Sequence, residues 1–134
     1  MNEQISTVQP AVSPWPEILV VDDDADVRGM LADVLAMEGY RTAEADGGRT
    51  ALTYLRSGHR PAVILLDLMM PDMDGWQFRA AQLGDPRLAG IPVIVLTADS
   101  REHQKACELG IARGLRKPID LDQLLAAVAE YRAG

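Results

Sequence analysis

Three short apolar segments constrain the fold of this chain more than any other feature. They span residues 18–21 (ILVV), 62–66 (AVILL) and 91–96 (IPVIVL), and none of them alternates apolar with polar residues. A strand with one face in water alternates, whereas continuous runs of Val, Ile and Leu are typical of strands buried on both faces of a parallel sheet. Two weaker segments, 40–45 and 112–116, complete a predicted set of five strands.

Between these strands the apolar spacing changes to that of helices. Apolar residues recur every three or four positions from residue 27 and again from residue 121, and Gly39 follows the first of these segments. This spacing predicts amphipathic helices, the first of which ends at the glycine. Asp120 and Gln123 suit a capping box at the start of the second. Weaker helical patterns cover residues 47–56, 75–83 and 100–109.

The alternation of strand and helix predicts a single α/β domain. Because connections between parallel strands are right-handed, five such units form a doubly wound five-stranded parallel sheet with helices on both faces. Ligands of such sheets bind beyond the carboxyl ends of the strands. We expect this domain to cover residues 17–134. Residues 1–16 carry three prolines and no sustained periodicity, which predicts a flexible N-terminal extension.

Composition and charge exclude several classes of function. The formal net charge of −7 disfavours binding to nucleic acid, which depends on Lys and Arg neutralising phosphates. The sequence contains neither a signal peptide nor a run of about 18 apolar residues, so we expect a cytoplasmic protein that does not bind membranes. The single cysteine, Cys107, excludes an internal disulfide, and its helical position predicts a small buried or half-buried side chain.

Chemically active side chains occur where the predicted strands end. Asp22 and Asp23 follow the first strand, Asp67 the third, Thr97 the fourth and Lys117 the fifth. Since the carboxyl ends of parallel strands meet at one end of the sheet, the three carboxylates should lie close together and repel. A Mg²⁺ ion, which takes oxygen ligands, would relieve this repulsion. The sequence therefore predicts a magnesium site where Asp67 can act as a nucleophile in phosphoryl transfer, near a hydroxyl and an ammonium group.

These residues lie in four motifs that resemble those of a known family. The motifs are VVDDDADVRGML, VILLDLMMPDMDGW, PVIVLTA and LRKPID. They resemble the receiver domain of bacterial two-component response regulators, over about residues 17–131. The resemblance implies the flavodoxin-like fold, written (βα)5. It also implies a signalling protein rather than an enzyme, one that catalyses only its own phosphorylation and dephosphorylation.

The resemblance implies a phosphorylation site with a bound metal. Asp67 would accept a phosphoryl group from a phosphohistidine on a sensor histidine kinase or a histidine phosphotransfer protein. Asp23 would bind Mg²⁺ directly and Asp22 through water. Asp67 and the backbone carbonyl of Met69 would complete the protein ligands.

The resemblance also implies a switch. Thr97 would be the hydroxyl that moves toward the phosphoryl group, and Lys117 the cation that pairs with it. A cis peptide bond before Pro118 would direct the lysine inward. Receivers usually carry Tyr or Phe three residues before Lys-Pro, whereas this chain has Gly114. We expect the phosphoryl chemistry to survive and the output mechanism to differ. A glycine within a short strand also predicts a bulge or a close backbone approach.

Several neighbouring residues have structural interpretations. Asp24 directly precedes a helix and is interpreted as its N-cap, while Asp72 and Asp74 suit turn and cap hydrogen bonds. Met70 and Met73 are interpreted as apolar cover for the site. The sequence ends soon after the last predicted helix, which favours a stand-alone receiver that acts by protein contact or phosphoryl relay.

Two other functions share parts of this pattern. A haloacid-dehalogenase-type phosphatase also begins with a strand followed by Asp-x-Asp, but it would need Thr or Val where the chain has Asp26, and it leaves the Asp67 loop unexplained. A flavodoxin-like cofactor binder needs a phosphate loop rich in Ser, Thr and Gly after the first strand, where three aspartates would repel phosphate.

Overall fold

Five strands occur close to the predicted positions. The computed structural model describes residues 17–108, 110–111 and 113–132, so the predicted N-terminal extension lies outside the described residues. The strands are β2 (Glu17–Val21), β3 (Arg41–Ala45), β4 (Val63–Asp67), β5 (Val93–Thr97) and β6 (Arg113–Arg116). The helices are α1 (Ala25–Met37), α2 (Gly48–Arg56), α3 (Gly75–Leu83), α4 (Ser100–Glu108) and α5 (Leu121–Ala129).

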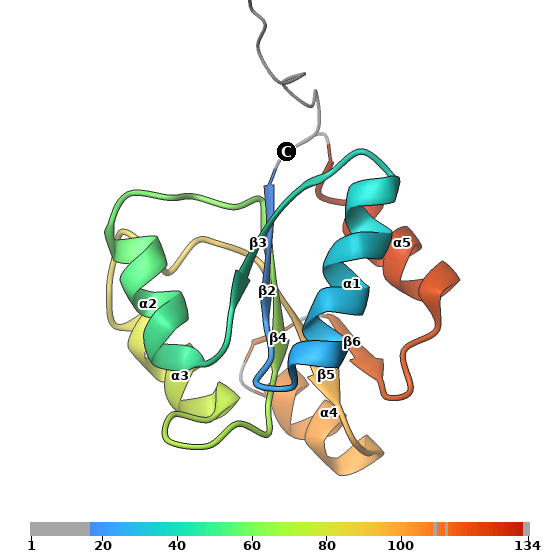
Figure 1. Ribbon diagram of the computed structural model, residues 1–134. Helices are drawn as coiled ribbons and strands as arrows, with labels where there is room; N and C mark the ends of the chain where they lie inside the picture. Colours follow the sequence, from blue (N-terminus) through green and yellow to red (C-terminus); the bar gives the residue numbers. More distant parts are fainter. Residues whose placement is uncertain (1–16, 109, 112, 133–134) are drawn as a thin grey trace, which may run out of the picture.

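The strands form one parallel sheet in the order β3-β2-β4-β5-β6. Strand β4 lies at its centre, with β2 on one side and β5 on the other (Figure 1). In this register Val21 pairs with Leu66, and Asp67 pairs with Leu96. The residues that follow β2, β4 and β5 therefore emerge side by side at the carboxyl end of the sheet. The predicted doubly wound architecture is confirmed.

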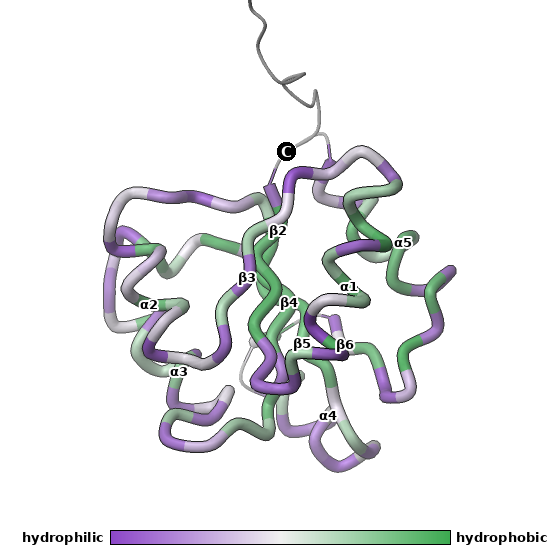
Figure 2. Tube along the Cα trace, in the orientation of Figure 1, coloured by the Kyte–Doolittle hydropathy of each residue, from purple (hydrophilic) through white to green (hydrophobic). Residues whose placement is uncertain are grey.

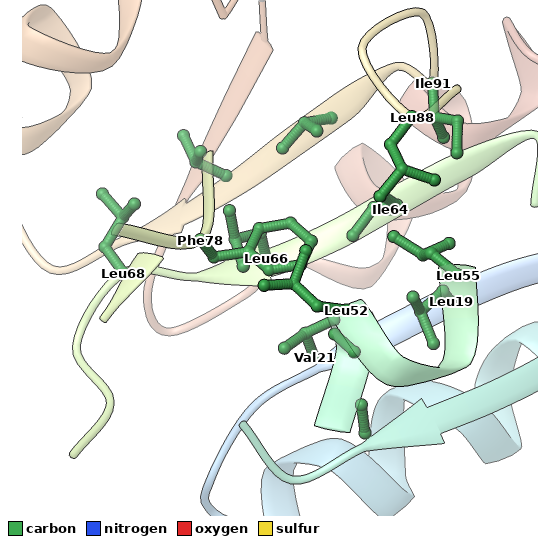
Figure 3. Packing of buried hydrophobic residues seen from close by; sticks show 14 of the residues in the cluster. Leu19, Val21, Leu52, Leu55, Ile64, Leu66, Leu68, Phe78, Leu88 and Ile91 are labelled. Atoms are coloured by element: carbon green, nitrogen blue, oxygen red, sulfur yellow. The ribbon is translucent and has the colours of Figure 1, made fainter. Parts of the chain in front are cut away.

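Helices cover both faces of the sheet because successive strand residues point to opposite sides. Leu19 and Val21 face one hydrophobic cluster, which helices α2, α3 and α4 cover, while Ile18 and Val20 face the other, which α1 and α5 cover. Figure 3 shows part of the first cluster, where Phe78 of α3 packs beside Leu66. Figure 2 shows the central strands β2, β4 and β5 as largely hydrophobic, while the helices carry both polar and hydrophobic residues.

The caps expected at Asp24 and Asp74 are present. At α5 the Asp120 side chain accepts a hydrogen bond from the Gln123 amide, which is one half of the capping box predicted there. The Asp24 side chain accepts hydrogen bonds from the backbone amides of Asp26 and Val27 at the start of α1. Asp74 and Gln77 form a reciprocal capping box at the start of α3. Such caps satisfy amides that have no partner within the helix. Asp24 and Asp74 are thus accounted for by local structure.

Two expectations about helix faces were wrong. Met30 belongs to the apolar pattern of α1 but is 41% exposed, whereas Ala32 is 4% exposed. The buried face of α1 is therefore rotated toward Ala32 and away from Met30. Cys107 is exposed, because α4 turns the preceding residue, Ala106, into the core instead. Among the described residues no helix is long and apolar enough to cross a membrane.

Replacement of Phe78 by Ala should destabilise the domain strongly. The side chain is fully buried in the cluster between α3 and the sheet, so its loss leaves a cavity and should lower the free energy of unfolding by about 3–5 kcal/mol. Urea unfolding followed by circular dichroism measures this change. Leu83→Ala on the same helix is the control, because Leu83 is 48% exposed and should cost less than about 1 kcal/mol. Equal losses in the two variants would contradict the packing described.

Candidate functional site

Three carboxylates gather at the carboxyl end of the sheet. Asp22 directly follows β2, Asp23 comes next, and Asp67 is the last residue of β4. One oxygen atom from each side chain lies within 4.8 Å of the others. Asp22 and Asp67 are buried, while Asp23 is exposed. The structure therefore brings together the three acidic residues that the sequence predicted.

Among the described residues, one ammonium group reaches this acidic cluster. Lys117 follows β6, and its Nζ atom lies 3.2 Å from Oδ1 of Asp67 and 3.5 Å from Oδ2 of Asp22. Its peptide bond to Pro118 is cis, as the resemblance implied. A single ammonium cannot neutralise three carboxylates. The cluster therefore keeps an excess of negative charge on oxygen atoms, which is the donor set that a hard divalent cation such as Mg²⁺ prefers.

The pKa of Asp67 reports this imbalance. Burial first and the neighbouring Asp22 charge second raise the pKa of Asp67 from 3.8 to about 6, although Lys117 and the Met69 amide act in the opposite direction. Burial alone would lower the pKa of Lys117, but the charges of Asp67 and Asp22 outweigh it, and the pKa of Lys117 is raised. At neutral pH the Asp67 carboxylate is therefore ionised although burial and the charge of Asp22 oppose its ionisation, and the neighbouring Lys117 is protonated.

Backbone contacts fix the loops that carry the carboxylates. The Asp24 amide donates to Oδ1 of Asp22 at 2.9 Å, and the Met69 amide donates to Oδ1 of Asp67 at 3.3 Å. Gly75 begins α3 against the loop after Asp67, and a Cβ atom there would lie 2.7 Å from the Leu68 Cα atom. This approach admits only glycine. The close approach of Gly75 to Leu68 packs the start of α3 against the loop after Asp67.

Thr97 ends β5 and is fully buried. Its hydroxyl donates to the Leu115 carbonyl of β6 at 3.4 Å, and its own carbonyl accepts a hydrogen bond from the Lys117 amide at 2.8 Å. In this conformation the hydroxyl is therefore engaged with β6.

The methionines near Asp67 differ from one another. Met69 is 65% exposed. The metal ligand predicted at this residue is its backbone carbonyl, so the side chain need not point toward the site. Met70 is 7% exposed and belongs to the core cluster. Met73 packs against that cluster and fills the space beside Gly48, where a Cβ atom would meet its Cγ atom at 2.7 Å. Met70 and Met73 are thus packing residues.

The bulge predicted at Gly114 is absent. Strand β6 pairs with β5 in continuous register from Arg113 to Arg116, and Gly114 pairs with Val95. The pairing of β5 with β6 continues through Gly114 without an extra residue, because the lack of a side chain does not affect the backbone hydrogen bonds. The position is half-buried and carries no ring.

Sequence reasoning missed two polar residues that organise the site. Nη1 of Arg28 donates to the Asp22 carbonyl at 2.8 Å, and its Nε atom pairs with Glu44 of β3 at 3.1 Å. The second residue, Glu102 of α4, accepts a hydrogen bond from the Ala98 amide next to Thr97. No spacing rule in the sequence reveals the contact of Arg28, which joins two elements through a long side chain. Asp99 and Glu102 have the spacing of a capping box, so this signal could have found Glu102, although not its contact with the Ala98 amide.

Asp67→Asn should stabilise the domain at alkaline pH in the absence of divalent cations. The raised pKa of Asp67 means that its contribution to stability is greatest below its ordinary pKa and is lost as pH rises through about 6. Asparagine cannot ionise, so the variant should exceed the wild type by about 1–3 kcal/mol at pH near 8. The difference should shrink as pH falls below the unfolded pKa.

Urea unfolding in a metal chelator at several pH values measures this difference. Asp72→Asn is the control, because Asp72 is an exposed carboxylate outside the acidic cluster. A difference that does not vary with pH would contradict the burial and repulsion assigned to Asp67.

Comparison with known proteins agrees with this geometry. Residues 18–129 match the family model described as the response regulator receiver domain. The chain is 36% identical to the alkaline phosphatase synthesis transcriptional regulatory protein SphR of Synechococcus elongatus over 92% of this chain and 51% of SphR. It therefore spans about half the length of that relative.

Solved structures show the same fold. The signal receiver domain of a histidine kinase from Syntrophus aciditrophicus has a TM-score of 0.77 at 35% identity, covering 87% of this chain and 89% of that one. Vibrio cholerae chemotaxis protein CheY4 has a TM-score of 0.79 at 28% identity, covering 87% and 98%. The chain belongs to the response regulator receiver domain family.

Proposed function

We propose that Asp67 accepts a phosphoryl group from a phosphohistidine on a sensor histidine kinase or a histidine phosphotransfer protein. The observation that carries this proposal is the buried, partly uncompensated carboxylate of Asp67 between Lys117 and the other two aspartates. A carboxylate held in this way is a nucleophile whose negative charge is not fully neutralised by its neighbours. The acceptor then signals through a protein surface that responds to phosphorylation.

The hydrogen bonds to Asp67 favour one of its oxygens as the nucleophile. Among the described residues, the Met69 amide and the Lys117 ammonium both donate to Oδ1. We assign the attack to Oδ2. A bond forms between Oδ2 and phosphorus while the bond from phosphorus to the imidazole nitrogen breaks, and the imidazole keeps that electron pair. Lys117 remains close enough to hold the charge of the acyl phosphate.

The acidic residues fit a bound Mg²⁺ ion. We propose Asp23, Asp22, Asp67 and the Met69 carbonyl as its ligands, supported by the oxygen donor set and its excess negative charge. When bound, Mg²⁺ would offset the carboxylate charge and attract the oxygens of the incoming phosphoryl group. Arg28 donates a hydrogen bond to the Asp22 carbonyl and so helps to fix the loop that carries Asp22 and Asp23.

Thr97 is the proposed switch hydroxyl. Its hydroxyl donates to the Leu115 carbonyl of β6 in the present conformation. The hydroxyl must give up this hydrogen bond before it can interact with a phosphoryl group on Asp67. Its position one residue beyond the Asp67–Leu96 pair supports this role.

A phosphatase of the haloacid-dehalogenase type is not favoured. The comparisons give the receiver family over most of the chain.

Incubation with phosphoramidate or acetyl phosphate and Mg²⁺ should add one phosphoryl group to the wild type. Asp67→Asn should abolish the adduct, because the amide is a poor nucleophile. Intact mass spectrometry measures the adduct, which should be stable in acid and labile in base. Asp72→Asn is the matched control, since Asp72 lies on the loop between β4 and α3 outside the acidic cluster and its positive φ of 67° suits asparagine. An adduct that survives in Asp67→Asn would contradict the assignment.

Addition of Mg²⁺ should stabilise the wild type against urea. A cation that binds the folded state alone raises the free energy of unfolding in proportion to the logarithm of its concentration above Kd. Asp23→Asn should lose most of this stabilisation, because it removes the exposed carboxylate of the cluster. Asp26→Asn is the control, since Asp26 is an exposed carboxylate on the first turn of α1 outside that cluster. Equal stabilisation of both variants would contradict the proposed ligands.

A further inference from the structure

Two hydrogen bonds of Glu102, to two different residues, close the loop between β5 and α4. Oε1 of Glu102 accepts a hydrogen bond from the Ala98 amide at 2.6 Å, and the Glu102 amide donates to Oδ1 of Asp99 at 3.0 Å. Ala98 and Asp99 are the residues between Thr97 and the first residue of α4. The side chain of Glu102 thus reaches back over the whole loop and fixes the residue adjacent to Thr97.

The residue directly before this loop, Thr97, carries the buried hydroxyl of the site. Thr97 is held by two contacts with β6, through its hydroxyl to Leu115 and through its carbonyl to the Lys117 amide. The amide of the next residue is held by Glu102. A shift of the Thr97 backbone away from β6 therefore strains or breaks the hydrogen bond between the Ala98 amide and Glu102, because Thr97 and Ala98 share a peptide unit.

Helix α4 has anchors that do not involve Glu102. Ala106 is buried in the core, and the Nζ atom of Lys105 lies 4.8 Å from the centre of the Trp76 ring of α3. These contacts hold α4 against α3 and the sheet. The Glu102 carboxylate can therefore release Ala98 without detaching the helix.

We propose that Glu102 is a positioning residue that holds the loop after β5 in the conformation where Thr97 is turned toward β6. The inference rests on the proposed phosphorylation of Asp67, since only then does the position of Thr97 set a rate. Loss of the Glu102 carboxylate increases the population of loop conformations in which Thr97 is free to approach Asp67. Phosphoryl transfer to Asp67 becomes faster as a result.

The first test measures the loop directly and does not depend on phosphorylation. Hydrogen exchange of the Ala98 amide, followed by NMR, should be about three- to tenfold faster in Glu102→Ala than in the wild type, the range expected for loss of one capping hydrogen bond. Glu108→Ala is the matched control, because it removes an exposed carboxylate from the same helix. Unchanged exchange at Ala98 would overturn the proposal.

The second test measures phosphoryl transfer with phosphoramidate and Mg²⁺. Glu102→Ala should be phosphorylated about three- to tenfold faster than the wild type and Glu108→Ala. Glu102→Gln keeps an acceptor oxygen without the charge and should give an intermediate rate. This variant also keeps the inference falsifiable if Glu102→Ala unfolds.

A double-mutant comparison separates positioning from a general loosening of the fold. If Glu102 acts through Thr97, Glu102→Ala should not change the rate in a Thr97→Ala background. An equal acceleration in both backgrounds, or faster Ala98 exchange with an unchanged rate, would overturn the proposal. A wild type that accepts no phosphoryl group would refute the proposed function instead, while the exchange experiment would still report on the contact between Glu102 and Ala98.

Discussion

Repulsion among three carboxylates at one end of the sheet is the constraint on which the site depends. Asp22 and Asp67 cannot move apart, because each directly continues or ends a strand whose residues are buried on both faces. A flexible loop would relax and let the charges separate into water. The packed strands β2 and β4 instead keep them close, with Lys117 as partial compensation. Hydrophobic burial along the strands thus keeps the carboxylates at their ends close together in spite of their mutual repulsion.

The topology explains why residues so far apart in sequence share this site. Strand β4 lies between β2 and β5, and β6 follows on the outer side of β5. Each crossover helix returns the chain to the opposite end of the sheet, so every strand delivers its last residue to the same end. One acidic pair, one acceptor, one hydroxyl and one ammonium converge there. The helices contribute little chemistry of their own, but their caps and their glycine contact at Gly75 fix the loops.

The sequence predicted the elements and the residues at the strand ends because both follow from local pattern. Continuous apolar runs predicted buried strands, and the polar residues after them could meet only at the carboxyl end of a parallel sheet. The contact of Arg28 with Asp22 depends on the reach of a long side chain and was not predictable, whereas the capping-box spacing of Asp99 and Glu102 could have pointed to Glu102 but not to its bond with the Ala98 amide. The rotation of α1 away from Met30 and the regular pairing at Gly114 also depend on tertiary packing. The metal ligands and the role of Thr97 stay predictions.

If Thr97 acts as the proposed switch, the glycine at position 114 changes how its movement can reach the surface. Where an aromatic ring fills this position, the ring can follow the hydroxyl into the space it vacates. Here β6 offers a half-buried glycine in regular pairing with Val95, and no side chain can respond. Two backbone hydrogen bonds of the described residues also hold Thr97 in place: its carbonyl accepts from the Lys117 amide, and the amide of the next residue donates to Glu102. We therefore expect a movement of Thr97 to be transmitted to the surface through the loop between β5 and α4. There the hydrogen bond of the Glu102 carboxylate, rather than the packing of an aromatic ring, responds to the movement.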